Sequence, residues 1–231
     1  MFAGPIQMKS SSSPRHSASP ALKVAQRVAA RAAQEVRLIG GRWKRTPLAV
    51  PVVAGLRPTP SRVRETLFNW LGQDMSGWRV LDAFSGSGAL GLEAASRGAE
   101  HVCLLEREPL LVKALRGMVQ RLKADGVQVI QADAIQWMRQ QATQAKVFDL
   151  VFLDPPFDDN LFESALQAAV SCVPVGGWIY LEAPHAYAET SEQPSVSGLR
   201  LYRQGKAGAV HYHLFQRVAD SSGVSSTGSG V

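Results

Sequence analysis

The chain has 231 residues, of which 45% are apolar, and this length favours one domain with an appended segment. It contains no apolar run of the roughly 18 residues that a membrane-spanning helix needs, and residues 1–19 lack the apolar middle of a secretory signal. Its two cysteines, Cys103 and Cys172, are too few and too widely separated for a disulfide framework or a zinc site, so we expect reduced thiols in a cytoplasmic protein with no membrane partner and no metal.

The net charge of +6 is distributed unevenly along the chain. Residues 1–65 carry 12 basic and 2 acidic side chains, a net +10, whereas residues 66–231 carry 13 and 17, a net −4. A positive segment on a mildly acidic body is what attraction to a phosphate backbone requires, and such binding weakens steeply with salt. The distribution indicates a polyanionic partner, with a solvated basic tail as the alternative for residues 1–30.

Residues 1–35 are expected to form a disordered basic extension. Residues 1–20 are rich in Ser and Pro, and residues 21–35 have the Ala-rich, basic composition of a helix. Residues 1–34 contain Arg, Lys and Ser but no acid, which also fits a mitochondrial presequence.

A hairpin and a helix are predicted for residues 36–75, which we expect to bind RNA. Short apolar pieces around Gly40-Gly41 and Thr46-Pro47 predict a small β-hairpin between Arg37 and Val53, in which we interpret Trp43 as packing, with base stacking as the alternative. The extended stretch Arg57-Pro-Thr-Pro60 then leads to Ser61, the predicted N-cap of a helix over residues 62–71. The candidate RNA contacts of this segment are Arg42, Lys44, Arg57, Thr59, Arg62 and Arg64. For Arg62 and Arg64, a place at the mouth of the active site and a solvated surface position are the alternatives.

A glycine-rich turn follows the first buried strand of the body. The strand beginning at Val80 continues through Gly86, Gly88 and Gly91 into a helix-forming segment, which is the pattern of a cofactor loop. The letters alone also fit a dinucleotide fingerprint. Asp82 favours a sulfonium cofactor over a dinucleotide. A carboxylate beside a pyrophosphate is unfavourable, whereas a cationic sulfonium tolerates it.

Two further acids follow later strands. Glu106 ends the strand over residues 101–106, about 20 residues beyond the first glycine, where a carboxylate can accept hydrogen bonds from ribose hydroxyls. Asp133 follows the strand over residues 127–131 and is a candidate N-cap for the helix that begins at Ala134.

The segment Asp154-Pro-Pro-Phe157 follows another buried strand, and open α/β sheets bind ligands at such carboxyl ends. An exocyclic amine on a base is a poor nucleophile because its lone pair is delocalised into the ring. Asp154 and the carbonyl of Pro155 can each accept an N–H from that amine, while Phe157 offers a face on which the base stacks. An isolated match of this kind is also compatible with a simple Pro-Pro turn.

The body alternates strands and helices, which predicts a mostly parallel, doubly wound α/β sheet. Only a few residues around Lys206-Ala-Gly208 join the last two strands, so these must form an antiparallel hairpin. The predicted strands are 79–83, 101–106, 127–131, 147–153, 177–182, 199–204 and 210–217, and the predicted helices are 88–97, 109–124, 134–142 and 160–172.

These motifs together resemble class I S-adenosylmethionine-dependent methyltransferases with the Asp/Asn-Pro-Pro-aromatic signature of amine methylation. More narrowly, residues 36 to about 217 are similar to the bacterial 16S rRNA guanine-N2 methyltransferase family. The narrower resemblance rests on an ordered set of segments: Ile39-Gly-Gly-Arg-Trp-Lys44, residues 56–71, the glycine loop, Asp154-Pro-Pro-Phe157 and Lys206-Ala-Gly-Ala-Val210.

The resemblance implies a class I, Rossmann-like methyltransferase domain over residues 76–218, followed by a disordered tail over 219–231. It implies transfer of a methyl group from S-adenosyl-L-methionine to the exocyclic N2 of a guanine in 16S rRNA, guanine 966 in the family. The partner would be the small ribosomal subunit or its assembly intermediate, and the enzyme a cytoplasmic monomer. A bacterial family also argues against the mitochondrial presequence.

The implied site residues fall into two groups. The cofactor contacts are Asp82, Phe84, Gly86, Gly88, Glu106 and, at the adenine, Asp133 and Ala134; the catalytic residues are Asp154, Pro155 and Phe157. Three alternatives stay open: a DNA adenine-N6 methyltransferase, which uses the same tetrapeptide; a noncatalytic RNA-binding assembly factor; and a nicotinamide-dependent oxidoreductase, which Asp82 and the closing hairpin disfavour.

Overall fold

The computed structural model describes residues 36–49, 51, 59–141, 148–156, 161–187 and 197–219, and the statements below concern these residues. Arg57 and Phe157, two of the predicted site residues, lie outside the described residues. The expected basic extension over residues 1–35 and all but the first residue of the expected tail also lie outside them.

Seven strands form one sheet in the order β5-β4-β3-β6-β7-β9-β8. The first five of these are parallel, and β9 pairs antiparallel with both β7 and β8. Central strands read as continuous apolar runs because both faces of the sheet are covered. The bounds are β3 (Arg79–Asp82), β4 (His101–Glu106), β5 (Val127–Gln131), β6 (Leu150–Leu153), β7 (Trp178–Ala183), β8 (Leu199–Ala207) and β9 (Val210–Arg217).

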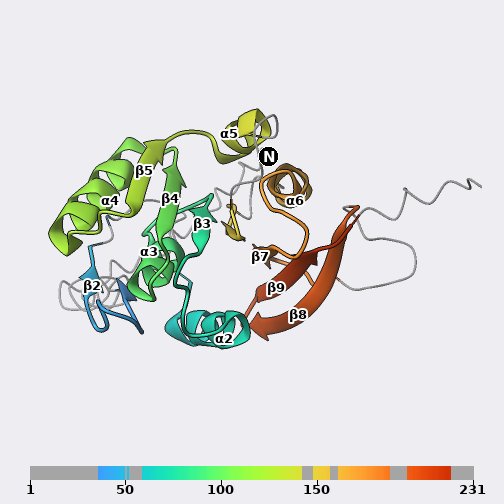
Figure 1. Ribbon diagram of the computed structural model, residues 1–231, viewed down its shortest axis with the longest axis horizontal. Coiled ribbons are helices and arrows are strands. Elements are labelled where there is room, and N and C mark those ends of the chain that lie inside the picture. Colours follow the sequence, from blue (N-terminus) through green and yellow to red (C-terminus); the bar gives the residue numbers. More distant parts are fainter. Residues whose placement is uncertain are drawn as a thin grey trace, which may run out of the picture. The chain divides into compact units, whose positions relative to one another are not determined.

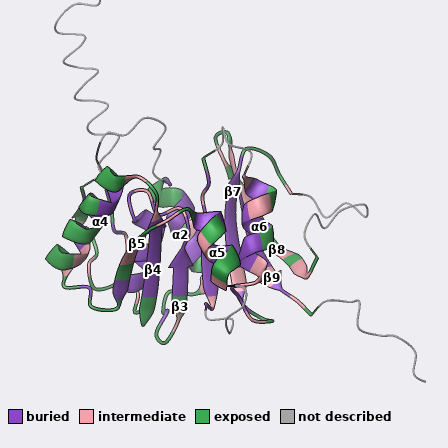
Figure 2. Ribbon diagram, turned by 90° about the horizontal axis from the view of Figure 1, so that it is seen from above, coloured by how far each residue is buried: buried purple, intermediate pink, exposed green. Residues whose placement is uncertain are grey.

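Helices cover both faces of this sheet. Figure 1 shows α5 and α6 on one side and α2 and α3 on the other, and Figure 2 shows the buried strands between them. Each face has its own apolar cluster, so the predicted doubly wound α/β fold with its closing antiparallel hairpin is confirmed. The bounds are α2 (Ser61–Leu71), α3 (Ala89–Ser96), α4 (Pro109–Leu122), α5 (Ala134–Gln141) and α6 (Phe162–Val170).

The predicted N-terminal hairpin is present but short. Strands β1 (Val36–Arg37) and β2 (Pro47–Leu48) pair antiparallel, and the loop between them is closed by bonds that join Leu38 to Thr46 and Arg45. Leu38 and Leu48 are buried in the same apolar cluster as Val63 and Leu67 of α2. The hairpin and α2 therefore share the core of the sheet.

The structure moves several predicted boundaries by one to three residues, three of them as follows. Ser61 is the first residue of α2 and not its cap, because Pro60 holds the N-cap position and its carbonyl accepts from Val63 and Arg64. Strand β6 begins at Leu150, three residues later than predicted. Strand β8 continues to Ala207, because its ladder with β9, after a register shift between Leu201 and Arg203, extends up to the tight turn at Gly208.

Among the described residues, no helix is both long enough and apolar enough to cross a membrane. Cys103 and Cys172 are buried free thiols, and burial raises the pKa of Cys103 to about 12 and that of Cys172 to about 11. Both thiols are therefore protonated and unreactive at neutral pH.

A buried ion cluster joins the hairpin, α2 and α3. Glu93 of α3 accepts from the Ile39 amide at 2.8 Å and from Arg97 Nε at 2.9 Å, and its Oε2 lies 3.5 Å from Arg64 Nη1. Arg64 is only 2% exposed and also donates to the carbonyls of Thr59 and Arg37. Burial lowers the pKa of Arg64, and the Glu93 carboxylate opposes that shift.

Glu93→Leu should destabilise the protein strongly, because it leaves the Arg64 guanidinium buried without its counter-ion. We expect a loss of about 3–5 kcal/mol in the free energy of unfolding, measured in urea. The double variant Arg64→Met, Glu93→Leu should recover part of this loss, because Arg97 and the Ile39 amide still lack the Glu93 acceptor. Glu163→Leu, at an exposed position on α6, should change stability little. A loss below about 1 kcal/mol for Glu93→Leu alone would contradict the assignment.

Candidate active site

The acids singled out above meet at the carboxyl edge of the parallel strands. Asp82 ends β3, Glu106 ends β4, and Asp133 and Asp154 follow β5 and β6. The strand order reverses between β3 and β6, and such switch points are where open α/β sheets bind ligands. Parallel topology therefore places residues from distant parts of the sequence at one edge.

The glycine turn between β3 and α3 has the geometry that its composition predicts. Gly86 and Gly88 have φ angles of 51° and 75°, a region that residues with a Cβ rarely adopt. A Cβ on Gly88 would also lie 2.7 Å from the Leu115 side chain. The turn is closed by the Gly88 amide, which donates to the Ser85 carbonyl at 2.6 Å.

Glu106 holds this turn from the neighbouring strand. Its Oε2 accepts from the Gly86 amide at 2.9 Å and its Oε1 from the Glu108 amide at 2.8 Å. These bonds fix the carboxylate beside the turn, and each oxygen keeps a further lone pair that can accept from a hydroxyl. Glu106 thus lies beside the glycine turn, and its contact with a ribose stays a prediction.

Asp82 has a structural partner that the sequence did not reveal. Its Oδ2 accepts from the Gly91 amide at 2.9 Å, in the first turn of α3, and the residue is 2% exposed. Burial raises the pKa of Asp82 to about 7 against the opposing Gly91 hydrogen bond, with smaller contributions from Glu106 and Glu182. The carboxyl group of Asp82 therefore binds the first turn of α3 through the Gly91 amide.

The predicted N-cap role of Asp133 is confirmed, since its Oδ1 accepts from the Gln136 amide at 2.8 Å. Asp133 is exposed and Ala134 is buried. Phe84 is half-buried against the apolar cluster on the α5 and α6 face. Their contacts with an adenine stay a prediction.

Asp154 follows β6 directly and is partly buried, and Pro155 after it is buried. Thr59 Oγ1 donates to Asp154 Oδ2 at 3.5 Å. Burial raises the pKa of Asp154 well above its ordinary value, the charges of Glu182 and Asp82 raise it further, and the Thr59 hydrogen bond opposes them. Asp154 is thus a carboxyl group that holds a proton more readily than an ordinary aspartate.

Two predicted RNA contacts lie in the interior instead. The Arg64 side chain is enclosed by the ion cluster, so the prediction that it faces RNA is wrong. Thr59 is also buried, because its hydroxyl faces Asp154. Both residues support the site from within the protein.

Arg42, Lys44 and Arg62 are exposed, as an RNA contact requires. The hairpin loop sits at the C-terminal end of α3, where the amides of Arg42 and Trp43 donate to the carbonyl and hydroxyl of Ser96. This end of α3 is the one farther from the glycine turn. Trp43 packs against the core, as expected, with the Arg42 guanidinium 4.0 Å from its ring centroid.

The sequence reasoning missed Glu182 of β7, which is 3% exposed. Its Oε1 accepts from Tyr180 Oη at 2.9 Å. The signal that could have found it is the one that found Glu106, namely an acid at the carboxyl end of an otherwise apolar parallel strand. No group of three or more His, Cys, Asp or Glu side chains suited to a metal ion occurs among the described residues.

Comparison with known proteins identifies this arrangement. The family described as conserved hypothetical protein 95 matches residues 36–216. The ribosomal RNA small subunit methyltransferase D proteins of Escherichia coli K12 and Haemophilus influenzae are each 39% identical over 189 residues, covering 80% and 79% of this chain and 91% and 94% of those proteins. The solved Escherichia coli protein yhhF superposes with a TM-score of 0.69 at 37% identity, covering 80% of this chain and 99% of that one.

The chain belongs to this family of methyltransferases. It is therefore an enzyme of methyl transfer, with S-adenosylmethionine as the methyl donor. The residues present fit such a donor: the Glu106 carboxylate can accept from ribose hydroxyls, the glycine turn permits close backbone approach, and a cationic sulfonium tolerates the carboxyl groups at this edge. The relatives do not favour a DNA adenine methyltransferase.

Asp82→Asn should change how stability depends on pH. The folded protein keeps the Asp82 proton up to about pH 7, whereas an unfolded aspartate loses its proton near pH 4, so this group costs the wild type stability as pH rises between these values. An asparagine oxygen can still accept from Gly91 but does not titrate. Relative to wild type, the variant should gain about 2–3 kcal/mol in the free energy of unfolding between about pH 5 and about pH 8.

Urea unfolding at several pH values measures this difference. Asp125→Asn, at an exposed position before β5, is the matched control and should follow the wild type. Parallel stability curves for wild type and Asp82→Asn would show that Asp82 titrates as an ordinary carboxyl group.

Proposed function

We propose that this chain transfers a methyl group from S-adenosylmethionine to the exocyclic N2 of a guanine in small-subunit rRNA. The observation that carries the proposal is the position of Asp154 and Pro155, which follow β6 directly across the switch point from the glycine turn. The names of the 39% identical relatives supply the RNA class. The resemblance of Asp154-Pro-Pro-Phe157 to the family signature indicates that the methylated atom is an exocyclic amine nitrogen.

The chemistry needs an acceptor pair next to the amine. Asp154 and the carbonyl of Pro155 accept its two N–H groups, which draws the nitrogen lone pair out of conjugation with the ring. When bound, S-adenosylmethionine supplies an electrophilic methyl carbon. Because the raised pKa of Asp154 makes it a better proton acceptor than an ordinary aspartate, this carboxylate can take the proton that the amine releases after methylation. Catalysis is otherwise mainly positioning.

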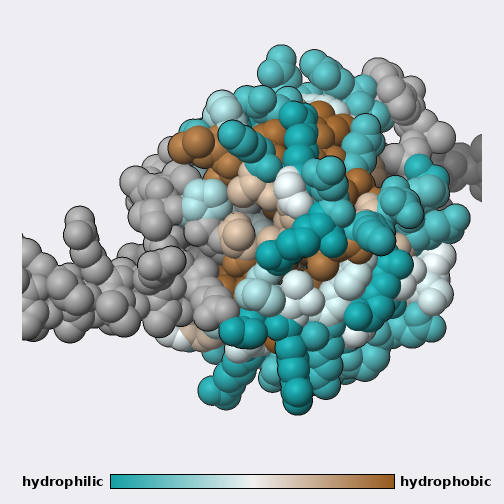
Figure 3. Space-filling model, turned by 90° about the vertical axis from the view of Figure 1, so that its left-hand side faces the viewer, coloured by the Kyte–Doolittle hydropathy of each residue, from teal (hydrophilic) through white to brown (hydrophobic). Residues whose placement is uncertain are grey.

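The target guanine must leave its base pair before N2 can reach this site. Flipping or unpairing a base costs a few kcal/mol, and binding energy from elsewhere on the RNA has to offset it. The exposed hairpin residues Arg42, Lys44 and Arg45 can supply phosphate contacts. Figure 3 shows hydrophilic side chains over the end of the protein that carries α4 and β2.

The distance between the glycine turn and the hairpin loop limits which RNA can contact both. Helix α3 has eight residues and spans roughly 11 Å between the glycine turn and the hairpin loop. An RNA that engages both must present its flipped guanine and a more distant stretch of backbone together. A folded RNA of the small ribosomal subunit, or of its assembly intermediate, satisfies this requirement, and we propose that a monomer acts on it.

Asp154→Ala should abolish methylation, because the amine loses its side-chain acceptor. Transfer of a labelled methyl group to small ribosomal subunits from a strain lacking the enzyme measures the activity. S-adenosylhomocysteine affinity, measured by calorimetry, should stay within about threefold of wild type, since the glycine turn and Glu106 are untouched. Asp154→Asn keeps one oxygen acceptor and should retain some activity. Undiminished activity of Asp154→Ala would refute the role.

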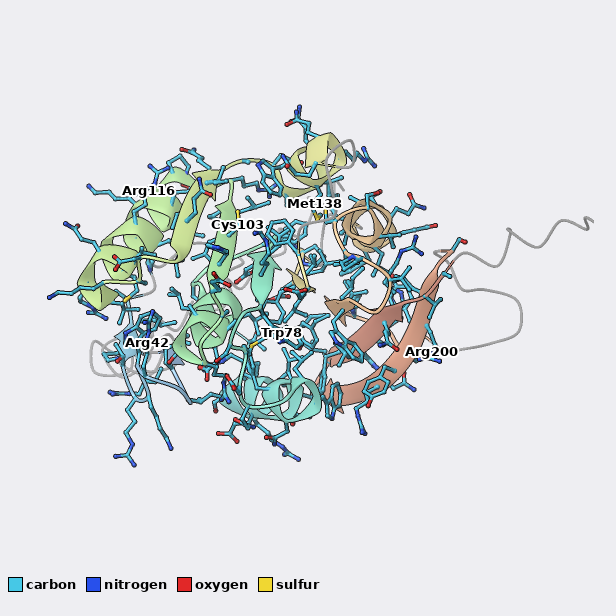
Figure 4. All side chains as sticks on the ribbon, viewed as in Figure 1. Arg42, Trp78, Cys103, Arg116, Met138 and Arg200 are labelled. Carbon is cyan, nitrogen blue, oxygen red and sulfur yellow. The ribbon has the colours of Figure 1, made fainter. Side chains whose placement is uncertain are left out.

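Removing the hairpin charges should weaken RNA binding without slowing the chemical step. For the double variant Arg42→Ala, Lys44→Ala, we expect the slope of log K against log salt to fall in magnitude by about 1–2, with kcat at saturating RNA unchanged. Arg200→Ala on β8 is the control, since Figure 4 places Arg42 and Arg200 at opposite ends of the sheet. Equal salt slopes for the double variant and wild type would show that these hairpin side chains do not contact RNA phosphates.

A further inference from the structure

Asp154 and Glu182 are neighbours at the edge of the sheet. Leu153 of β6 pairs with Leu181 of β7, and each acid follows its leucine by one residue. Side chains alternate along parallel strands, so both acids lie on the face of the sheet that α2 covers. Tyr180 lies on the same face, two residues before Glu182, and the partner of Glu182 on β9 is Tyr212.

The hydroxyl of Thr59 lies between the two carboxyl groups. It donates to Asp154 Oδ2 at 3.5 Å and also interacts with Glu182, whose Oε1 accepts from Tyr180 Oη at 2.9 Å. Two carboxylates offer about eight lone-pair sites, far more than two hydroxyl protons can satisfy. The pair therefore has acceptor capacity available for donors on a substrate.

Guanine presents the matching donors. Its Watson–Crick edge carries the N1–H and the N2 amine side by side, whereas adenine pairs its amine with an unprotonated N1, which is an acceptor. If Asp154 and the Pro155 carbonyl accept from the amine, an acceptor next to Asp154 would lie near N1. The N1–H of guanine would donate to that protein acceptor. The unprotonated N1 of adenine would instead place a second acceptor opposite it.

We propose that Glu182 accepts the N1–H of the target guanine and so selects guanine over purines that lack this proton. The inference rests on the proposed function and names a specificity-determining residue for it. Tyr180 and Thr59 orient the carboxylate. Their hydrogen bonds favour its anionic form and oppose the burial that raises the pKa of Glu182.

The test compares two RNAs that differ only at the methylated position. Once that nucleotide has been mapped, small subunits are assembled in vitro with either guanosine or 2,6-diaminopurine riboside there; the analogue keeps the N2 amine but has no N1–H. We expect wild-type kcat/KM to favour guanosine by roughly a hundredfold, because a site built for a donor rejects an acceptor. For Glu182→Gln this ratio should fall at least roughly tenfold, since the amide can donate to the unprotonated N1.

Controls separate recognition from folding. Glu163→Gln, at an exposed position on α6, should keep the wild-type ratio. Glu182→Gln should match wild type in melting temperature within a few degrees and in S-adenosylhomocysteine affinity. If wild type accepts both RNAs equally, or if Glu182→Gln slows both by the same factor, the assignment of Glu182 is overturned while guanine methylation stands. If wild type methylates neither RNA, the proposed function fails, and this inference fails with it.

Discussion

Burial of carboxyl groups at the carboxyl edge of the parallel sheet is the constraint on which the site depends. Asp82 and Glu182 are almost wholly enclosed, and Asp154 is partly so. Taking such groups out of water is costly, and each is compensated by a particular donor: the Gly91 amide, the Tyr180 hydroxyl and the Thr59 hydroxyl. The Gly91 amide belongs to α3, Thr59 to the segment before α2, and Tyr180 to β7, the strand that also carries Glu182. Three parts of the fold therefore contribute to holding these acids.

The parallel pairing of the sheet explains why the glycine turn and the Asp154 segment can cooperate although about 70 residues separate them in sequence. Strands β3 and β6 are direct neighbours and run in the same direction. Their ends are therefore held at one edge by the backbone ladder, independently of any side chain. A donor bound over the turn and an amine held by Asp154 would then meet with little conformational adjustment, which is what catalysis by positioning requires.

Much of this architecture was predictable because it depends on local patterns. Apolar runs, the glycine spacing, and an acid just after each strand identified β3 to β6 and the edge they share. Arg64 shows where such reasoning ends: a helical arginine beside other charges suggests exposure, and its buried partner Glu93 is 29 residues away in sequence. Glu182 was missed although it lies near the end of an apolar strand, as Glu106 does, and its position beside Asp154 depends on the pairing of β6 with β7, which only the assembled sheet reveals.

One guanidinium connects the two ends of this protein that an RNA would engage. Arg64 donates both to the Arg37 carbonyl in the hairpin and to the Thr59 carbonyl beside the catalytic edge. If RNA displaced the hairpin, the displacement would act on the Arg64 guanidinium, which also donates to the carbonyl of Thr59 next to Asp154. If the hairpin binds RNA as proposed, substrate docking and the position of Asp154 would be coupled through Arg64, and a hairpin transplanted onto another scaffold would lose that coupling even if it kept every surface charge.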